Sequence, residues 1–161
     1  VPMIGVWAGI SYFLTKLDKK IVIIILIPLL LSFSFLTFNR NKDWKDPITF
    51  YTKILSHNPY IARVRNNLAM AYEEKGMLTE AEREYKKAIE LDDRYPQTHY
   101  NLALLYLKEN RIEEGIEELK RAIEIDDNFI YAHQKLAEVY LNLGKYEEAK
   151  KEMMKVERLM K

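Results

Sequence analysis

A pattern of apolar and small residues recurs every 34 positions between Ile61 and Leu159. Its clearest members are three leucine–alanine pairs and three tyrosines at that interval: Leu68-Ala69, Leu102-Ala103, Leu136-Ala137, Tyr72, Tyr106 and Tyr140. Within each unit these residues lie four apart, which places them on one face of a helix. Four residues after each tyrosine stands Gly76, Asn110 or Gly144. Such residues reach a left-handed backbone at low cost, so the helix is predicted to end there.

A second helix is predicted in the other half of each unit. Its apolar face uses spacings of four and three and carries small residues where two helices must approach closely: Ala81, Tyr85 and Ala88; Gly115, Leu119 and Ala122; Ala149, Met153 and Val156. Each unit is therefore a predicted helical hairpin. One hairpin cannot bury both of its faces, so the units are expected to stack on one another.

A 34-residue helical hairpin with leucine, alanine and tyrosine at these offsets resembles the tetratricopeptide repeat. The resemblance gives three full repeats, 61–94, 95–128 and 129–161. Residues 39–60 are expected to hold a linker and one half-repeat helix, which Asp46 can cap and Pro47 can begin. The predicted fold class is all-α: an N-terminal transmembrane helical hairpin followed by an α-solenoid of a half repeat and three full repeats.

Residues 1–38 are predicted to form transmembrane helices at about 1–17 and 21–38. No charge lies between Lys20 and Arg40, and these 19 residues would rise about 28 Å as a helix, close to the hydrocarbon core of about 30 Å. A buried helix of a soluble domain is the alternative, but the stretch is too long and too uniformly apolar to leave a polar face. The lipid bilayer is thus an expected partner. Because the chain begins inside an apolar run, we expect it to be the tail of a longer protein.

Charge refines this interpretation. The chain has 25 Lys and Arg against 24 Asp and Glu, which gives no general case for nucleic-acid binding. It has no cysteine, which excludes disulfides and thiolate metal sites. The basic loop Lys16–Lys20 is expected in the cytoplasm, which places the repeats outside it. Arg40, Lys42 and Lys45 favour the opposite orientation, but the positive-inside rule weakens before a long domain.

Two short segments resemble polytopic glycosyltransferase-like membrane proteins that carry C-terminal tetratricopeptide repeats. The segment 1–5, VPMIG, is similar to the end of an L-Y-x-P-x-x-G signature, and 40–47, RNKDWKDP, is similar to an R-N-x-x-W-x-D-P linker. This resemblance implies an alternative function, the acceptor-recognising C-terminal part of such an enzyme. In that family the catalytic acidic residues are expected in extracytoplasmic loops near the N-terminus of the protein, a region that this chain lacks. No catalytic residue is therefore assigned in this chain, and enzymatic activity is left open.

No active site, cofactor site or metal site is predicted in the residues present. His99 and His133 lie 34 apart and could approach each other, but no third ligand has suitable spacing, so packing is the preferred interpretation. Adjacent carboxylates such as Glu117 and Glu118 point about 100° apart on a helix and are interpreted as solvated faces. The sequence has no glycine-rich phosphate loop and no Ser-His-Asp set.

A peptide-binding groove is predicted on the concave face built by the first helices of the repeats. Its candidate residues are Arg63, Asn66, Asn67, Met70, Tyr100, Asn101, Leu104, Leu107, Tyr131, Gln134, Glu138 and Leu141. The apolar members are interpreted as a binding strip that the core does not need, while Asn67, Asn101 and Gln134 would bond a peptide backbone.

Two further expectations concern partners. Asn67 and Asn101 partly match the carboxylate clamp of chaperone-binding family members, but Tyr100, Leu104 and Glu138 depart from it. The predicted function is therefore a membrane-anchored scaffold that binds a protein or peptide of another kind. Self-association is the alternative use of the last helix, whose apolar residues end the chain: Met153, Met154, Leu159 and Met160.

Overall fold

The computed structural model describes residues 19–42 and 46–161, and the side chains of residues 24–35 and 46–161. Within these residues the chain forms eight helices and no strand. It divides into two compact units, Val1–Asp46 and Pro47–Lys161. The first predicted membrane helix, about 1–17, and linker residues 43–45 lie outside the described residues.

The first unit contains helix α2, Lys19–Lys42, with Pro28 inside it. This helix includes the segment 21–38 predicted to be helical, and the side chains described for it, 24–35, are all exposed. The prediction that residues 1–38 form a transmembrane hairpin is not borne out by the described part of the chain, where no helix is long and apolar enough to cross a membrane.

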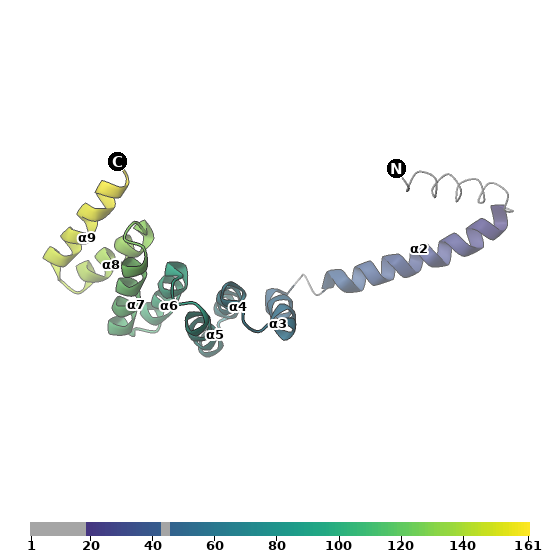
Figure 1. The fold of residues 1–161 in the computed structure, drawn as a ribbon, viewed down its shortest axis with the longest axis horizontal. Coiled ribbons are helices and arrows are strands. Elements are labelled where there is room, and N and C mark those ends of the chain that lie inside the picture. The colour runs from purple at the N-terminus through teal and green to yellow at the C-terminus, as the bar shows by residue number, and fades with distance from the viewer. Residues whose placement is uncertain (1–18, 43–45) are drawn as a thin grey trace. The chain divides into compact units, whose positions relative to one another are not determined.

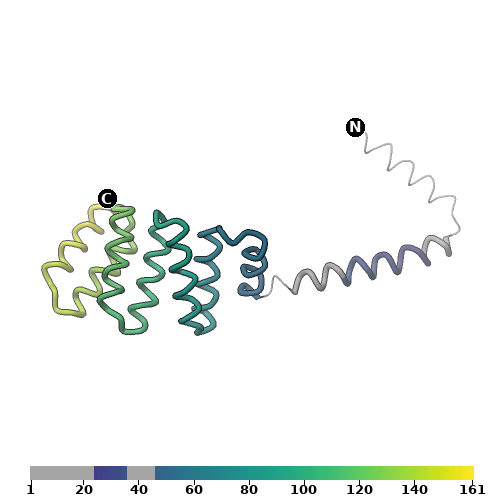
Figure 2. The backbone as a smooth tube through the Cα atoms, turned by 60° about the horizontal axis from the view of Figure 1, so that its bottom comes forward, coloured from purple at the N-terminus to yellow at the C-terminus, as the bar shows by residue number. Residues whose placement is uncertain are grey.

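The second unit is a row of antiparallel helices (Figures 1 and 2). They are α3 Pro47–His57, α4 Ala62–Glu74, α5 Leu78–Leu91, α6 Pro96–Lys108, α7 Ile112–Ile125, α8 Ile130–Asn142 and α9 Tyr146–Leu159. The hairpins are α4–α5, α6–α7 and α8–α9; α3 packs on α4, while α5 contacts α6 and α7 contacts α8. The predicted solenoid of a half repeat and three full repeats is therefore present.

The turns inside the hairpins follow the residue types that predicted them. Gly76, Asn110 and Gly144 have φ of 75°, 61° and 71°. After α4, the amide of Met77 donates to the carbonyl of Tyr72 at 2.9 Å and that of Gly76 donates to Glu73 at 2.9 Å. This pair of bonds is the Schellman motif, which satisfies carbonyls that a helix end leaves open.

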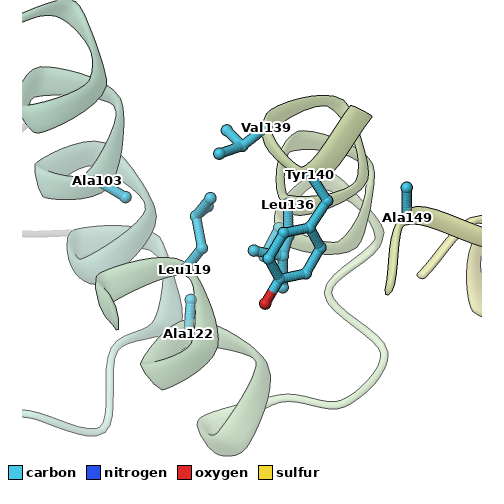
Figure 3. Close-up of a cluster of buried hydrophobic side chains, with 8 residues drawn as sticks. Ala103, Leu119, Ala122, Leu136, Val139, Tyr140 and Ala149 are labelled. Carbon is cyan, nitrogen blue, oxygen red and sulfur yellow. The ribbon is translucent and has the colours of Figure 1, made fainter. Parts of the chain in front are cut away.

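Two clusters of buried side chains hold the hairpins together. One joins α4, α5 and α6 around Tyr85, Leu102 and Leu105. The other joins α6 to α9 around Leu119, Leu136 and Val139 (Figure 3). Tyr85, Leu102, Leu105 and Leu119 are fully buried, so each interface between hairpins is a close-packed apolar core with a large side chain from each side.

A polar contact repeats in each hairpin and links its two helices to the preceding turn. In the second hairpin His99 Nδ1 lies 2.6 Å from Glu118 Oε2, and Nε2 lies 3.2 Å from the carbonyl of Asp93. In the third hairpin His133 makes the same contacts with Glu152, at 2.6 Å, and Asp127, at 3.1 Å. The interpretation of Glu117 and Glu118 as a solvated pair was therefore wrong for Glu118, which binds a buried histidine.

The first hairpin builds the same link with an arginine in place of the histidine. Arg65 Nη1 donates to Glu84 Oε2 at 2.6 Å, and its Nε donates to the carbonyl of Pro59 at 3.0 Å. Burial raises the pKa of the Glu84 carboxyl, but hydrogen bonds from Lys87 and Arg65 outweigh it and leave the pKa below its usual value. We call these three arrangements the clasps, centred on Arg65, His99 and His133.

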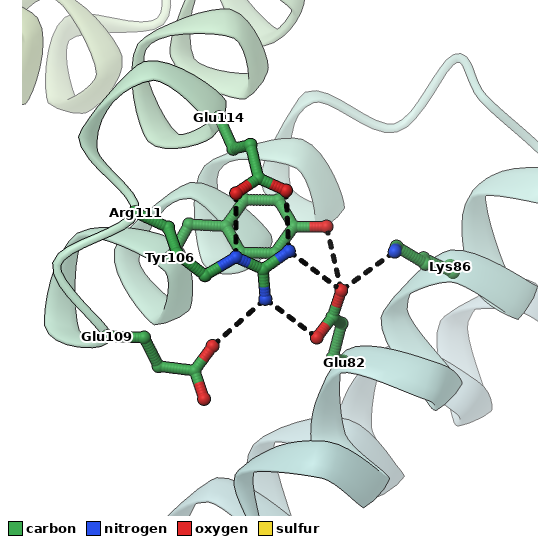
Figure 4. A network of polar contacts seen from close by, with 6 residues as sticks. All are labelled: Glu82, Lys86, Tyr106, Glu109, Arg111 and Glu114. Atoms are coloured by element: carbon green, nitrogen blue, oxygen red, sulfur yellow. Dashed lines mark hydrogen bonds and ion pairs between the residues drawn. The ribbon is translucent and has the colours of Figure 1, made fainter.

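A second polar network joins the first two full repeats (Figure 4). Glu82 of α5 accepts hydrogen bonds from Arg111 Nη1 at 2.9 Å and from the hydroxyl of Tyr106 at 3.1 Å. Arg111 also binds Glu114 and Glu109 and lies 4.0 Å from the ring centroid of Tyr106. The hydrogen bond from Arg111 is the largest effect that lowers the pKa of Glu82, to about 2. The carboxylate of Glu82 is thus a fixed attachment point for the next hairpin.

Candidate peptide-binding groove

The twelve predicted groove residues all lie on the first helices of the repeats, α4, α6 and α8. A hollow of about 330 Å³ opens between α4 and α6. Three predicted residues line it, Met70, Asn101 and Leu104, together with Glu73, Glu74, Tyr85 and Lys108. This hollow brings three of the twelve predicted residues to one common site.

A chain of side-chain amides links α6 to α4, and Asn101 is the member of this chain that lines the hollow. Gln97 donates to Asn101 at 2.9 Å, Asn101 donates to Asn66 at 3.1 Å, and Asn66 donates to Asn67 at 3.3 Å. Asn66 and Asn101 are buried, and Asn101 uses both ends of its amide in the chain. The sequence proposed Asn101 as a ligand for a peptide backbone, but its place in the structure is that of a link between helices, whereas Asn67 is half-buried.

The wall of the hollow combines apolar and charged groups. Met70 is 42% exposed and faces the same space as the half-buried Leu104. Lys108 Nζ lies 3.5 Å from Glu73 Oε1, and the hydroxyl of Tyr85 donates to the other oxygen of Glu73 at 3.4 Å. Burial raises the pKa of Tyr85, and the charge of Glu73 raises it further. The phenol therefore remains protonated and acts as a hydrogen-bond donor.

Two of the residues assigned to the binding strip pack against the core instead. Tyr100 and Leu107 are partly buried against the second cluster. Leu107 fills the space beside Gly115, where an added Cβ would come within 2.7 Å of Leu107 Cδ2. Tyr100 packs edge-on against Phe129, with ring centroids 5.4 Å apart. The prediction that the core does not need these side chains was wrong, while Tyr131, which lies beside Phe129 at 5.9 Å, is exposed.

The remaining predicted residues are distributed over neighbouring hollows rather than one continuous site. Asn67 and Met70 line a hollow with Pro47 and Tyr51 of α3. Leu107 lines another with Glu138, and Gln134, Glu138 and Leu141 line a third between α8 and α9. Arg63 instead contacts Tyr95, donating to its hydroxyl.

Sequence reasoning missed Tyr85 as a groove residue because it lies on a second helix. A signal was present, since Tyr85 is the one hydroxyl-bearing side chain among the equivalent residues Tyr85, Leu119 and Met153. The described residues hold no group of three His, Asp or Glu side chains suited to a metal ion. The hollow can bind a ligand without reacting with it. It offers the apolar side chains of Met70 and Leu104, the amide of Asn101 and one ion pair, Lys108 with Glu73.

Family models match most of this second unit. Residues 69–110 and 105–144 match a model described as TPR repeat, and residues 130–159 match one described as tetratricopeptide repeat. Together these matches span more than half of the chain. The chain belongs to the tetratricopeptide repeat family.

Known proteins similar to this chain include two solved structures. The crystal structure of MamA protein superposes with a TM-score of 0.65 at 24% identity, covering 76% of this chain and 67% of that one. The second TPR of Spaghetti (RPAP3), solved bound to the HSP90 peptide SRMEEVD, gives a TM-score of 0.58 at 25% identity, covering 62% of this chain and 92% of that one.

One similar curated protein is much longer. Protein O-mannosyl-transferase F38B6.6 of Caenorhabditis elegans is 34% identical over 80 residues, which are 50% of this chain and 11% of that protein. The chain thus spans about a tenth of the length of this relative.

Proposed function

We propose that the solenoid is a scaffold whose concave face binds a short segment of a partner protein. The observation that carries the proposal is the hollow between α4 and α6, which is lined by exposed Met70, by Leu104 and by the amide of Asn101, held by its hydrogen bond to Asn66. An apolar wall over fixed polar groups suits a peptide that inserts one apolar anchor and bonds its backbone nearby. A solved structure of similar fold is described as bound to the HSP90 peptide SRMEEVD, which supports peptide binding as a use of this fold.

The charges of the hollow favour an apolar anchor over a strongly acidic peptide. Lys108 already lies 3.5 Å from Glu73, and Glu74 lines the same space, so the carboxylates outnumber the cation. A peptide with one medium-sized apolar residue and few acidic ones matches these groups best. Recognition of a partner through a carboxylate clamp is accordingly not part of the proposal.

Replacing Met70 with glutamate is expected to weaken peptide binding by about tenfold or more, because a charge would enter the apolar wall. The probe is a set of peptides selected from a random phage-displayed library on the wild-type chain, with affinities then measured by calorimetry. Met77→Glu is the matched control, since Met77 is 38% exposed and lies in the turn after α4. Peptides that bind both variants as they bind the wild type would show that the concave face is not the site.

A second candidate function is acceptor recognition within a membrane glycosyltransferase. The match to the O-mannosyl-transferase supports it, as does the similarity of segments 1–5 and 40–47 to such proteins. In this case the concave face would select proteins for modification, and the transfer chemistry would lie elsewhere in a longer chain. Reading the coding sequence upstream of Val1 tests it: further apolar spans with an acidic first loop support it, and their absence contradicts it.

We also propose that residues 1–38 attach the chain to a membrane, with the repeats on the extracytoplasmic side. The stretch without charge between Lys20 and Arg40 supports the attachment, and the basic loop Lys16–Lys20 supports the orientation. Protease added to intact spheroplasts is therefore expected to digest the repeats, as followed by an antibody against residues 145–161. Full protection until the cells are lysed would place the repeats in the cytoplasm.

A further inference from the structure

The last hairpin leaves open a face that the first two hairpins have covered. A hollow of about 430 Å³ lies between α8 and α9, lined mainly by apolar side chains that include Leu141, Met153, Val156 and Met160. Met153 is 54% exposed. The equivalent residues one and two repeats earlier, Leu119 and Tyr85, are fully buried.

The internal counterparts of this face show what covers it. Tyr85 is buried in one cluster with Leu102, Leu105 and Tyr106 of α6. Leu119 is buried in the same way with the equivalent residues of α8, which are Leu136, Val139 and Tyr140 (Figure 3). Twice in this chain, therefore, the face receives the first helix of the following hairpin.

The two covering helices share a residue pattern. At their buried positions α6 has Thr98, Leu102, Leu105 and Tyr106, and α8 has Ala132, Leu136, Val139 and Tyr140. The pattern is a small residue, leucine four positions later, a branched aliphatic residue seven positions later and tyrosine eight positions later. These spacings form one face of a helix, and they specify what fits the open face.

We propose that the open face of α8 and α9 binds, in trans, an amphipathic helix of a partner protein that carries this pattern. The interface would continue the internal one, with Met153 and Val156 in the roles of Leu119 and Ala122. A folded second copy of this chain does not meet the requirement, because its helices α4, α6 and α8 already pack on α3, α5 and α7 of the same copy. The proposal concerns a different face from the hollow between α4 and α6 and does not depend on it.

Polar groups at the rim add a preference for charge. In the first of the two internal interfaces, Glu82 of α5 accepts hydrogen bonds from Tyr106 and from Arg111, which follows that tyrosine by five residues. The residue equivalent to Glu82 in the last hairpin is Lys150, which is exposed. An acidic residue five positions after the partner's tyrosine would therefore lie opposite Lys150. This pair would be the ion pair of Arg111 and Glu82 with its two charges exchanged.

A labelled peptide with the sequence of residues 128–145, which contains α8, is the direct probe. We expect it to bind the full chain, as measured by fluorescence anisotropy. Met153→Glu should weaken binding by about tenfold or more, because it places a charge in the apolar interface. Met154→Glu should change binding less than about twofold, since Met154 is 51% exposed and does not line the hollow. A peptide with Lys145→Glu should bind about two- to fivefold more tightly through Lys150.

Three results would overturn the proposal. The first is no binding of the peptide at concentrations up to about 1 mM, a Kd limit that corresponds to about 4 kcal/mol. The second is equal binding to Met153→Glu and Met154→Glu. The third is a dimer of the wild-type chain that Met153→Glu alone dissociates, which would make the face a contact between copies. The variant Met70→Glu should leave α8-peptide binding unchanged, so failure of the groove proposal and failure of this one are distinguishable.

Discussion

Replacing Leu102 with alanine is expected to lower the free energy of unfolding by about 2–5 kcal/mol. Leu102 is fully buried and packs in the cluster with Tyr85 and Leu105. Truncation removes apolar contacts and leaves a cavity that neighbouring helices can close only in part, because α6 is held on one side by α5 and on the other by α7. Chemical denaturation of the full chain, followed by circular dichroism, measures the loss.

The control for Leu102→Ala is Glu117→Ala on the exposed face of α7. Because that side chain leaves no cavity, its loss should stay within about 0.5 kcal/mol. The contrast also tests the stacking of the repeats: in a solenoid, damage to a middle unit weakens the contacts on both of its sides. Similar losses for the two variants would contradict the assignment of Leu102 to the core.

The repeat and its turns could be predicted from sequence because they depend on local rules. Gly76, Asn110 and Gly144 all adopt positive φ, as expected of residues that favour a left-handed backbone at the end of a helix. Leu68, Leu102 and Leu136 are buried, as their shared position in the 34-residue pattern requires. In these cases the residue type and its spacing carry the information.

The groove was harder to predict because its packing depends on particular neighbours. Leu107 occupies a groove position in the repeat, yet it turns inward because Gly115 leaves room beside α6. The equivalent second-helix positions in the other hairpins hold Ala81 and Ala149. Tyr100 is held by Phe129, which belongs to the next repeat. Neither contact follows from the position of a single residue within its unit.

The clasps had a sequence signal that spacing analysis of histidines alone did not detect. A glutamate follows each of the clasp residues Arg65, His99 and His133 by 19 residues, at Glu84, Glu118 and Glu152. Considering only the histidines suggested packing or a metal pair, whereas including Arg65 shows that the position holds a hydrogen-bond donor for a carboxylate. The chemistry becomes visible once all three repeats are aligned.

The clasp in the second hairpin predicts losses of different size for two substitutions of His99. Both ring nitrogens face acceptors, Glu118 Oε2 at 2.6 Å and the carbonyl of Asp93 at 3.2 Å. Arg65 meets the same two kinds of acceptor, a glutamate carboxylate and a backbone carbonyl, with N–H donors of its guanidinium group. A guanidinium group can donate to both acceptors at once. The position therefore holds a side chain with two nitrogens that face two acceptors, and not merely an aromatic ring.

His99→Leu is expected to lower the free energy of unfolding by about 2–3 kcal/mol, because it leaves Glu118 and the carbonyl of Asp93 without their donor. His99→Arg should cost less than about 1 kcal/mol, since arginine can donate to both acceptors as it does at Arg65. His57→Leu is the matched control: His57 is exposed at the end of α3, so its replacement should stay within about 0.5 kcal/mol. Denaturant titrations of the three variants decide the matter. If His99→Arg lowers the free energy of unfolding as much as His99→Leu, the clasp requires the shape of the imidazole and not its two nitrogens.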